Sequence, residues 1–331
     1  MSRAARGNPY AGTNQTGLVP RVGRYALLIV LVAGCVGPNA PGPTSTLPPP
    51  PVSRDAIVFE TESGDFTVIL YPEAAPRTVE LVKSYAAEGY YAGREFNRVV
   101  PGHVIQVVDK AGGASDDPRR VPLETDPDYH FSAGAAGIAR GADPNSGGPE
   151  LFFMDFGTSH LDGNYTVWGQ LVDGLDVVHH IARVPTVDLT QIPGASDYLT
   201  DRQAVDAVTI TRARLVHIEL PGERAAHYPL QVARNARVGD WRHSLEWPND
   251  LHAGRPSDLT WYVRTYNDSN PAPPARDLTI RVEGAVLSVV GDADAPGALH
   301  WAWTPPRPGH YDVELARGTE TLATLGLDVT A

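Results

Sequence analysis

The sequence has a single cysteine, no excess of basic residues and an N-terminal apolar run too short to cross a membrane. One cysteine, Cys35, excludes a disulfide framework and any multi-cysteine metal or iron–sulfur site. There are 27 Lys and Arg against 39 Asp and Glu, a net charge of −12. This argues against a nucleic-acid-binding protein, which needs a basic face to neutralise phosphates. The length of 331 residues indicates two domains, at ~100 to 200 residues per domain.

Residues 1–34 have the composition of an export signal. They carry no acidic residue and four arginines, Arg3, Arg6, Arg21 and Arg24, followed by an apolar run from Tyr25 to Ala33. That run is far shorter than the ~20 residues of a membrane-spanning helix. It ends in Leu31-Val32-Ala33-Gly34-Cys35, which resembles the lipobox of bacterial lipoproteins. The resemblance implies cleavage before Cys35 and its lipidation; the alternative is a small cysteine buried or removed with the segment.

Lipidation of Cys35 predicts an exported protein anchored to the bacterial cell membrane or envelope. The acyl chains hold it there because each methylene buried in the bilayer contributes ~0.8 kcal/mol to the free energy of membrane binding. Cleavage would also remove the four arginines, and 23 − 39 leaves a net charge of −16. Residues 35–54 are rich in Gly, Pro, Ser and Thr and include four consecutive prolines, Pro48 to Pro51. This composition predicts an extended linker rather than part of a core.

Residues 55–218 are predicted to form a first folded domain. Ile57 and Phe59 alternate before Ser63-Gly64, and Phe66, Val68 and Leu70 alternate after it, which predicts a β-hairpin. Helical spacing begins at Pro76 and stops at Gly89, and a second short helix is predicted over 175–181. Further strand-like runs lie at 94–109, 136–139, 151–154, 165–171 and 208–216. Many short antiparallel strands with two helices are typical of a closed, helix-capped barrel.

Three segments of this domain carry a family resemblance. They are "GYYAGREFNRVVPGHVIQVVD" from Gly89, "AGIARGADPNSGGPELFFMDF" from Ala136 and "HLDGNYTVWGQLVDGLDVV" from His160. Their order and spacing resemble those of cyclophilins. The resemblance implies a mainly β fold, an eight-stranded antiparallel barrel with a helix closing each end. It also implies peptidyl-prolyl cis–trans isomerase activity, with proline-containing polypeptides as partners.

The resemblance also assigns roles to individual residues. Arg98 matches the family's hydrogen-bond donor to the proline nitrogen, and Gln106 matches the glutamine that positions it. Phe153 and Leu161 match the floor and wall of the proline pocket, and Ala139 with Arg140 matches the strand that pairs with the peptide. The remaining substrate-binding residues expected from the resemblance are Phe96, His103, Val104, Leu151, His160 and Tyr165.

Some of these positions depart from the family pattern. His103 and Val104 stand where Phe and Met are usual, and Leu151 stands where Gln commonly precedes a Phe-Phe pair. These changes predict a more polar pocket and a weakened catalyst. His179-His180 suggests a metal site, but adjacent helical residues diverge by ~100° and no further ligand is suitably spaced. No metal or cofactor is expected.

Residues 219–331 are predicted to form a second domain. They contain five of the six tryptophans and no cysteine or lysine. Apolar residues alternate in four runs, at 259–263, 278–282, 311–315 and 325–329, separated by Asn, Asp, Gly and Pro. This pattern favours an immunoglobulin-like β-sandwich. The tryptophans are interpreted as core, with a carbohydrate- or protein-binding face as the alternative.

The favoured function is isomerisation of X-Pro bonds in exported or surface proteins. Two alternatives are kept: a module that binds proline-containing segments without turnover, and an envelope protein in which the barrel is only a scaffold.

Overall fold

The computed structural model describes residues 49–108, 117–187, 203–233, 236–238, 241–264, 275–292 and 296–331. The predicted export signal, Cys35 and the linker up to residue 48 lie outside the described residues. Residues 48–331 form one compact unit that contains two separate β structures, each with its own core. The predicted domain boundaries remain a prediction.

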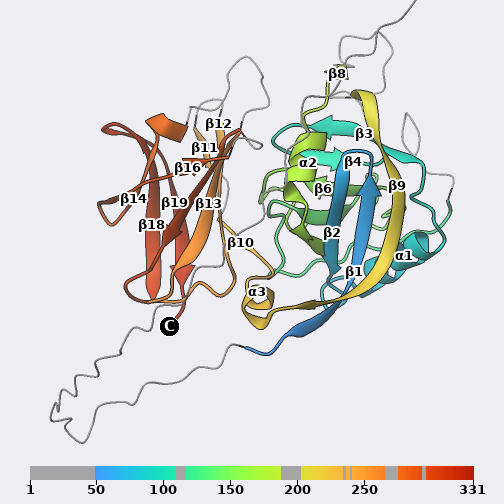
Figure 1. The fold of residues 1–331 in the computed structure, drawn as a ribbon, viewed down its shortest axis with the longest axis horizontal. Helices are drawn as coiled ribbons and strands as arrows, with labels where there is room; N and C mark the ends of the chain where they lie inside the picture. The colour runs from blue at the N-terminus through green and yellow to red at the C-terminus, as the bar shows by residue number, and fades with distance from the viewer. Residues whose placement is uncertain are drawn as a thin grey trace, which may run out of the picture. The chain divides into compact units, whose positions relative to one another are not determined.

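The first β structure is a closed antiparallel barrel of eight strands (Figure 1). Around the barrel the strand order is β1, β2, β7, β5, β6, β4, β3 and β9, and β9 pairs with β1 to close it. Their bounds are β1 Val52–Thr61, β2 Gly64–Leu70, β3 Arg94–Val100, β4 Val104–Gln106, β5 Ala135–Ile138, β6 Leu151–Met154, β7 Val167–Asp173 and β9 Gln203–Leu220. A short strand, β8 (Thr186–Val187), adds to the edge of β9. The predicted mainly β, barrel-containing fold is confirmed.

The alternating residues of the first hairpin form the barrel core. Ile57 pairs with Val68 and Phe59 with Phe66, and all four side chains are buried in one cluster. Residues two apart in a strand point to the same face, so this alternation fixes which side of the sheet turns inward. The single run predicted over 94–109 is instead two strands, β3 and β4, because a left-handed glycine, Gly102 (φ 74°), turns the chain between them.

Two helices pack onto this core. Helix α1 (Pro76–Ala87) has proline in its first turn, where the missing N–H breaks no helical hydrogen bond. Its buried face includes Val79, Val82 and Tyr85, as the spacing predicts. Helix α2 (Leu175–Ile181) buries Val178 and Ile181 in the same cluster. A third, short helix, α3 (Gly222–Ala226), follows β9.

The second β structure consists of two antiparallel sheets over a common core, as a sandwich requires. The first sheet contains β10 Gln231–Val232, β11 Ala236–Val238, β12 Trp241–Trp247, β13 Ser257–Arg264, β16 Val290–Gly291 and β17 Ala298–Trp303. The second contains β14 Thr279–Val282, β15 Ala285–Leu287, β18 Gly309–Arg317 and β19 Glu320–Val329. A 3-10 turn, η3, covers Ala275–Asp277. Trp261 and Trp301 are buried in the shared core, in line with their interpretation as core residues.

Among the residues that the structure describes, no helix has the length and apolar character needed to span a bilayer.

Candidate active site

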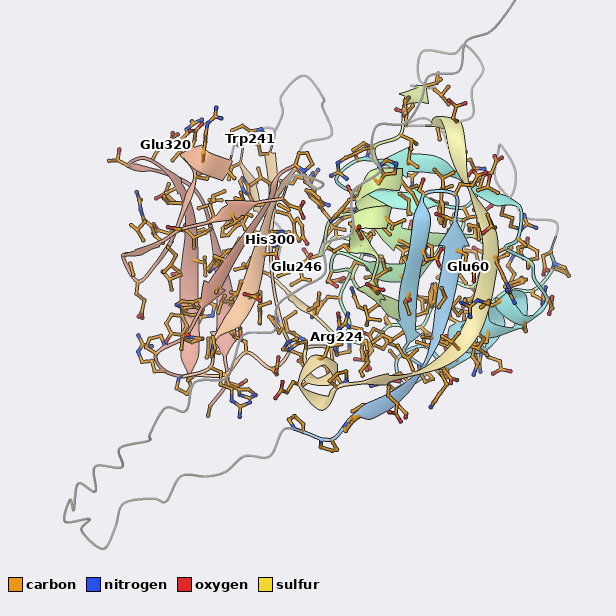
Figure 2. All side chains as sticks on the ribbon, viewed as in Figure 1. Glu60, Arg224, Trp241, Glu246, His300 and Glu320 are labelled. Atoms are coloured by element: carbon orange, nitrogen blue, oxygen red, sulfur yellow. The ribbon has the colours of Figure 1, made fainter. Side chains whose placement is uncertain are left out.

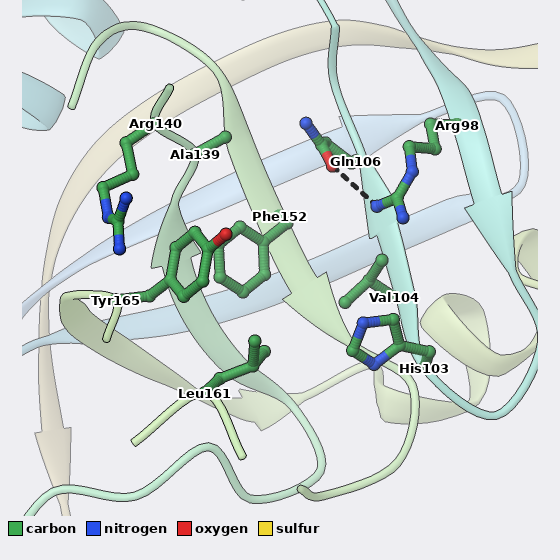
Figure 3. A pocket seen from close by; sticks show the side chains of 9 residues that line it. All are labelled: Arg98, His103, Val104, Gln106, Ala139, Arg140, Phe152, Leu161 and Tyr165. Atoms are coloured by element: carbon green, nitrogen blue, oxygen red, sulfur yellow. Dashed lines mark hydrogen bonds between the residues drawn. The ribbon is translucent and has the colours of Figure 1, made fainter. Parts of the chain in front are cut away.

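A pocket opens on the barrel beside the β3–β4 hairpin (Figure 3). Side chains from four parts of the chain meet there: the hairpin itself, the end of β5, strand β6 and the loop before β7. The lining residues are Arg98, His103, Val104, Gln106, Ala139, Arg140, Phe152, Leu161 and Tyr165. The pocket thus brings together eight of the residues predicted to act on substrate and adds one, Phe152.

Arg98 and Gln106 form a directly paired unit at the edge of this pocket. They are cross-strand partners in the β3–β4 ladder. Arg98 Nη1 donates to Gln106 Oε1 at 2.9 Å, the bond drawn in Figure 3. Gln106 is buried, so its amide has little freedom to leave this arrangement. The permanent charge and planar fork of the arginine are therefore held in one place by a buried amide.

Glu150 extends this pair, although no pattern in the sequence marks it as part of the site. Its carboxyl is buried and accepts a hydrogen bond from the side chain of Gln106. Because Gln106 Oε1 already faces Arg98, the amide NH₂ is the group left to face Glu150. Burial raises the pKa of Glu150 to about 7, against the lowering effect of Gln106 and nearby arginines. The resulting chain is Glu150–Gln106–Arg98.

The pocket floor is Phe152, and the prediction of Phe153 in that role is wrong by one residue. Phe153 is fully buried in the barrel core against Phe59 and Phe66, with ring centroids 5.2 and 5.0 Å away. Adjacent residues of a strand point to opposite faces, so only one of the Phe-Phe pair can face the pocket. Two further predicted pocket residues, Leu151 and Phe96, also lie in the core rather than in the pocket lining.

The register of β6 explains why Phe152 takes this place. Phe152 lies opposite Gly137 on β5. A Cβ at Gly137 would lie 2.1 Å from the Phe152 ring, so the glycine leaves the space into which that ring fits. The predicted roles put the family's glutamine at Leu151, two residues before the predicted floor Phe153. With Phe152 as the floor, the same resemblance puts that position at Glu150, and the prediction for Leu151 is corrected.

The two histidines of the pocket wall lie together. The rings of His103 and His160 stack with centroids 5.5 Å apart, and Thr158 Oγ1 lies 2.6 Å from His160 Nδ1. Burial lowers the pKa of both imidazoles, that of His103 well below its ordinary value, so both rings are neutral at pH 7. His103 lines the pocket, whereas His160, predicted to bind substrate, is not among the lining residues and contacts the pocket through its stacking on His103.

Comparisons with known proteins agree with this geometry. The family model "Cyclophilin type peptidyl-prolyl cis-trans isomerase/CLD" matches residues 56–215. A peptidyl-prolyl cis-trans isomerase-like 1 of Aspergillus fumigatus is 32% identical over 165 residues, covering 48% of this chain and 94% of the relative. A probable peptidyl-prolyl cis-trans isomerase of Brucella suis is 33% identical over 143 residues, covering 39% of this chain and 72% of that protein. The chain belongs to the cyclophilin-type peptidyl-prolyl cis-trans isomerase family.

One solved structure similar to this chain is a Cryptosporidium parvum cyclophilin-type isomerase. It covers 50% of this chain and 98% of its own, at 23% identity and a TM-score of 0.42. The same protein has also been solved in the presence of the dipeptide Ala-Pro.

The remaining residues of the cyclophilin pocket lie along one side. The Ala139 N–H donates to the Glu150 carbonyl at 2.9 Å, just beyond the β5–β6 ladder. Arg140 lies over the Tyr165 ring at 4.7 Å and donates from Nε and Nη2 to the Asn164 carbonyl at 3.0 and 2.7 Å. The Phe152 and Tyr165 rings meet edge to face at 5.9 Å. Arg140 is thus engaged with the loop that carries Tyr165.

This arrangement combines an apolar floor and wall with the fixed guanidinium of Arg98. Phe152, Leu161 and Val104 supply apolar surface for a small ring, and Arg98 supplies N–H donors beside it. The arrangement suits binding of an apolar ring together with donation of a hydrogen bond to an adjacent polar atom.

Proposed function

We propose that this cyclophilin accelerates the isomerisation of X-Pro bonds in exported or surface polypeptides. The observation that carries the proposal is the position of Arg98, held by Gln106 at the edge of a pocket whose floor is Phe152. The proline ring occupies the space above Phe152, against Leu161 and Val104. The peptide bond before it then lies next to the Arg98 guanidinium.

The chemistry needs no nucleophile and no proton transfer. A peptide bond resists rotation by ~18–20 kcal/mol because the nitrogen lone pair is delocalised into the carbonyl. In the twisted state the lone pair is localised on nitrogen and can accept a hydrogen bond. A guanidinium N–H fixed beside that nitrogen binds the twisted state more strongly than either planar state, and so lowers the barrier.

Replacement of Arg98 tests this role. We expect Arg98→Ala to reduce kcat/KM for a short X-Pro peptide by about 100-fold, the usual loss when one preorganised donor is removed. The rate is measured by NMR exchange spectroscopy on the peptide, which requires no coupled protease. Arg212→Ala, an exposed arginine on β9, is the matched control and should retain full activity.

The outcomes separate the alternatives. No acceleration by the wild-type protein would reject the isomerase function. Saturable peptide binding without acceleration would favour a proline-peptide-binding module, and neither binding nor acceleration would leave only a scaffold role.

The proposed location rests on the N-terminal sequence. Four arginines, a short apolar run and Ala33-Gly34-Cys35 support export followed by lipidation of Cys35. In bacteria that process lipoproteins, we expect the wild-type chain in the membrane fraction, with a diacylglyceryl group on Cys35 detected by mass spectrometry. Cys35→Ser should lack the lipid and leave the membrane fraction. Membrane association unchanged by Cys35→Ser would refute the lipid anchor.

A further inference from the structure

Two ionisable side chains from the sandwich are buried against the barrel. Glu246 on β12, labelled in Figure 2, and Arg264 at the end of β13 are each 4% exposed. Their neighbours Leu245 and Val263 face the sandwich core, so strand alternation directs Glu246 and Arg264 to the other face of that sheet. Buried ionisable groups need hydrogen-bonding partners, and here those partners belong to the barrel.

Arg264 joins two loops that carry the pocket wall. Its Nη1 donates to the Gly102 carbonyl at 2.9 Å, and its Nη2 donates to Thr158 Oγ1 at 2.7 Å. Gly102 directly precedes His103. Thr158 Oγ1 also lies 2.6 Å from His160 Nδ1. One guanidinium therefore connects the two loops whose imidazole rings stack on each other.

The turn at Gly102 is held from both sides. Its N–H donates to Asp155 Oδ2 at 2.6 Å, while its carbonyl accepts from Arg264. A Cβ at Gly102 would lie 3.2 Å from Arg264 Cβ, so the stem of the arginine packs closely against the turn. The chain then continues directly into His103 and Val104, which line the pocket.

The sandwich holds the barrel at a second place. The Ala133 N–H donates to Glu246 Oε1 and Oε2 at 2.9 and 3.1 Å, and Gly157, the residue before Thr158, donates its N–H to the same carboxyl. Between these polar contacts the rings of Phe156 and Tyr262 lie 4.6 Å apart. The loop that contains Gly157 and Thr158 thus donates one hydrogen bond to Glu246 on β12 and accepts another from Arg264 on β13, the neighbouring strand.

We propose that Arg264 is a positioning residue of the isomerase pocket, through which the C-terminal sandwich fixes the wall formed by His103, Val104 and Leu161. The proposal rests on the proposed isomerase function. Arginine suits this task because its planar fork can donate to two acceptors at once in a fixed geometry. A wall held in this way keeps the proline ring aligned with Arg98, and misplacement of such a wall lowers turnover without removing any group that touches the substrate.

The test uses full-length variants. Arg264→Met keeps the length of the side chain but removes both donors, and Arg264→Lys keeps the charge without the fork. Arg281→Met is the matched control, because Arg281 donates to the Gly318 carbonyl within the sandwich. At 10 °C, we expect Arg264→Met to lose about 10-fold in kcat/KM and Arg264→Lys to lose less, while Arg281→Met matches the wild type.

A double-mutant cycle with Thr158→Val shows whether Arg264 acts through the wall. If it does, the double variant Arg264→Met/Thr158→Val should be no slower than the slower single variant, because both changes break the same connection. If the fold-losses in kcat/KM of the two single variants multiply in the double variant, the proposal is overturned. It is also overturned if Arg264→Met is folded at 10 °C and as active as the wild type.

A second measurement does not depend on turnover. The imidazole ¹⁵N signals of His103 and His160 should shift in Arg264→Met and stay unchanged in Arg281→Met. Unchanged signals in Arg264→Met would also overturn the proposal. If the wild type is inactive but the signals shift, the isomerase function fails while the link between Arg264 and the wall stands.

Discussion

At the scale of single residues, Glu150 gives the pocket a group that titrates near neutral pH. When ionised, its carboxylate can only accept, so it holds the Gln106 NH₂ and leaves Oε1 for Arg98. When protonated, its O–H can donate to the Gln106 oxygen and compete with Arg98 for it. Because the pKa of Glu150 is about 7, we expect kcat/KM to rise as the pH increases from 6 to 8.

Glu150→Gln tests this pH dependence. A glutamine has no charge to lose, so the rise in kcat/KM between pH 6 and 8 should disappear, although the protein stays folded and active. Burial holds the pKa of the His103 imidazole well below its ordinary value and lowers that of His160, which moves both titrations toward lower pH. The profile is measured by NMR exchange at constant ionic strength. A slope that persists in Glu150→Gln would assign the titration to another group.

At the scale of elements, strand β6 separates pocket from core by alternation. Phe153→Ala empties a fully buried core site and should lower the free energy of unfolding by about 3–5 kcal/mol. Phe152→Ala removes the pocket floor and should reduce kcat/KM strongly, with a smaller loss of stability because the void opens to solvent. Denaturant unfolding and the exchange assay, run on both variants, measure the two effects. If the two variants lose equal stability and Phe152→Ala keeps the activity of the wild type, Phe152 is not the pocket floor.

The same strand shows what a sequence can predict about such a site. Alternation at Ile57, Phe59, Phe66 and Val68 predicts the first hairpin because one face of a barrel strand is buried along its whole length. In β6 all four residues are buried, so no alternation marks the pocket face. Only the register against β4 and β5 decides it, and that register comes from tertiary pairing.

Arg98 and Gln106 were predictable because their motif matches the family residue by residue. Glu150 was not: its role depends on a contact with Gln106, far along the sequence, and on burial by the surrounding strands. Arg264 was also out of reach, since its partners lie 162 and 106 residues away in another β structure.

At the scale of the whole molecule, Glu246 makes the contact between sandwich and barrel sensitive to pH. Burial raises the pKa of its carboxyl from 4.5 to about 8. Between pH 4.5 and about 8, the Glu246 carboxyl is ionised in the unfolded chain and still protonated in the folded chain. The folded state therefore binds more protons, and the contribution of Glu246 to stability falls as the pH rises from about 4.5 to 8.

Glu246→Gln should remove this contribution while keeping an oxygen that accepts from the Ala133 N–H. The amide resembles the protonated acid, so the variant and the wild type should differ least near pH 5. By pH 8.5 the variant should be the more stable protein, because it has no carboxyl to ionise in a buried site. The free energy of unfolding, measured by denaturant titration at each pH, gives this difference directly.

Glu320→Gln is the matched control: Glu320 is exposed and paired with Arg317, so its substitution should change stability little at any pH. A stability difference between Glu246→Gln and wild type that stays constant from pH 5 to 8.5 would show that folding does not raise the pKa of Glu246.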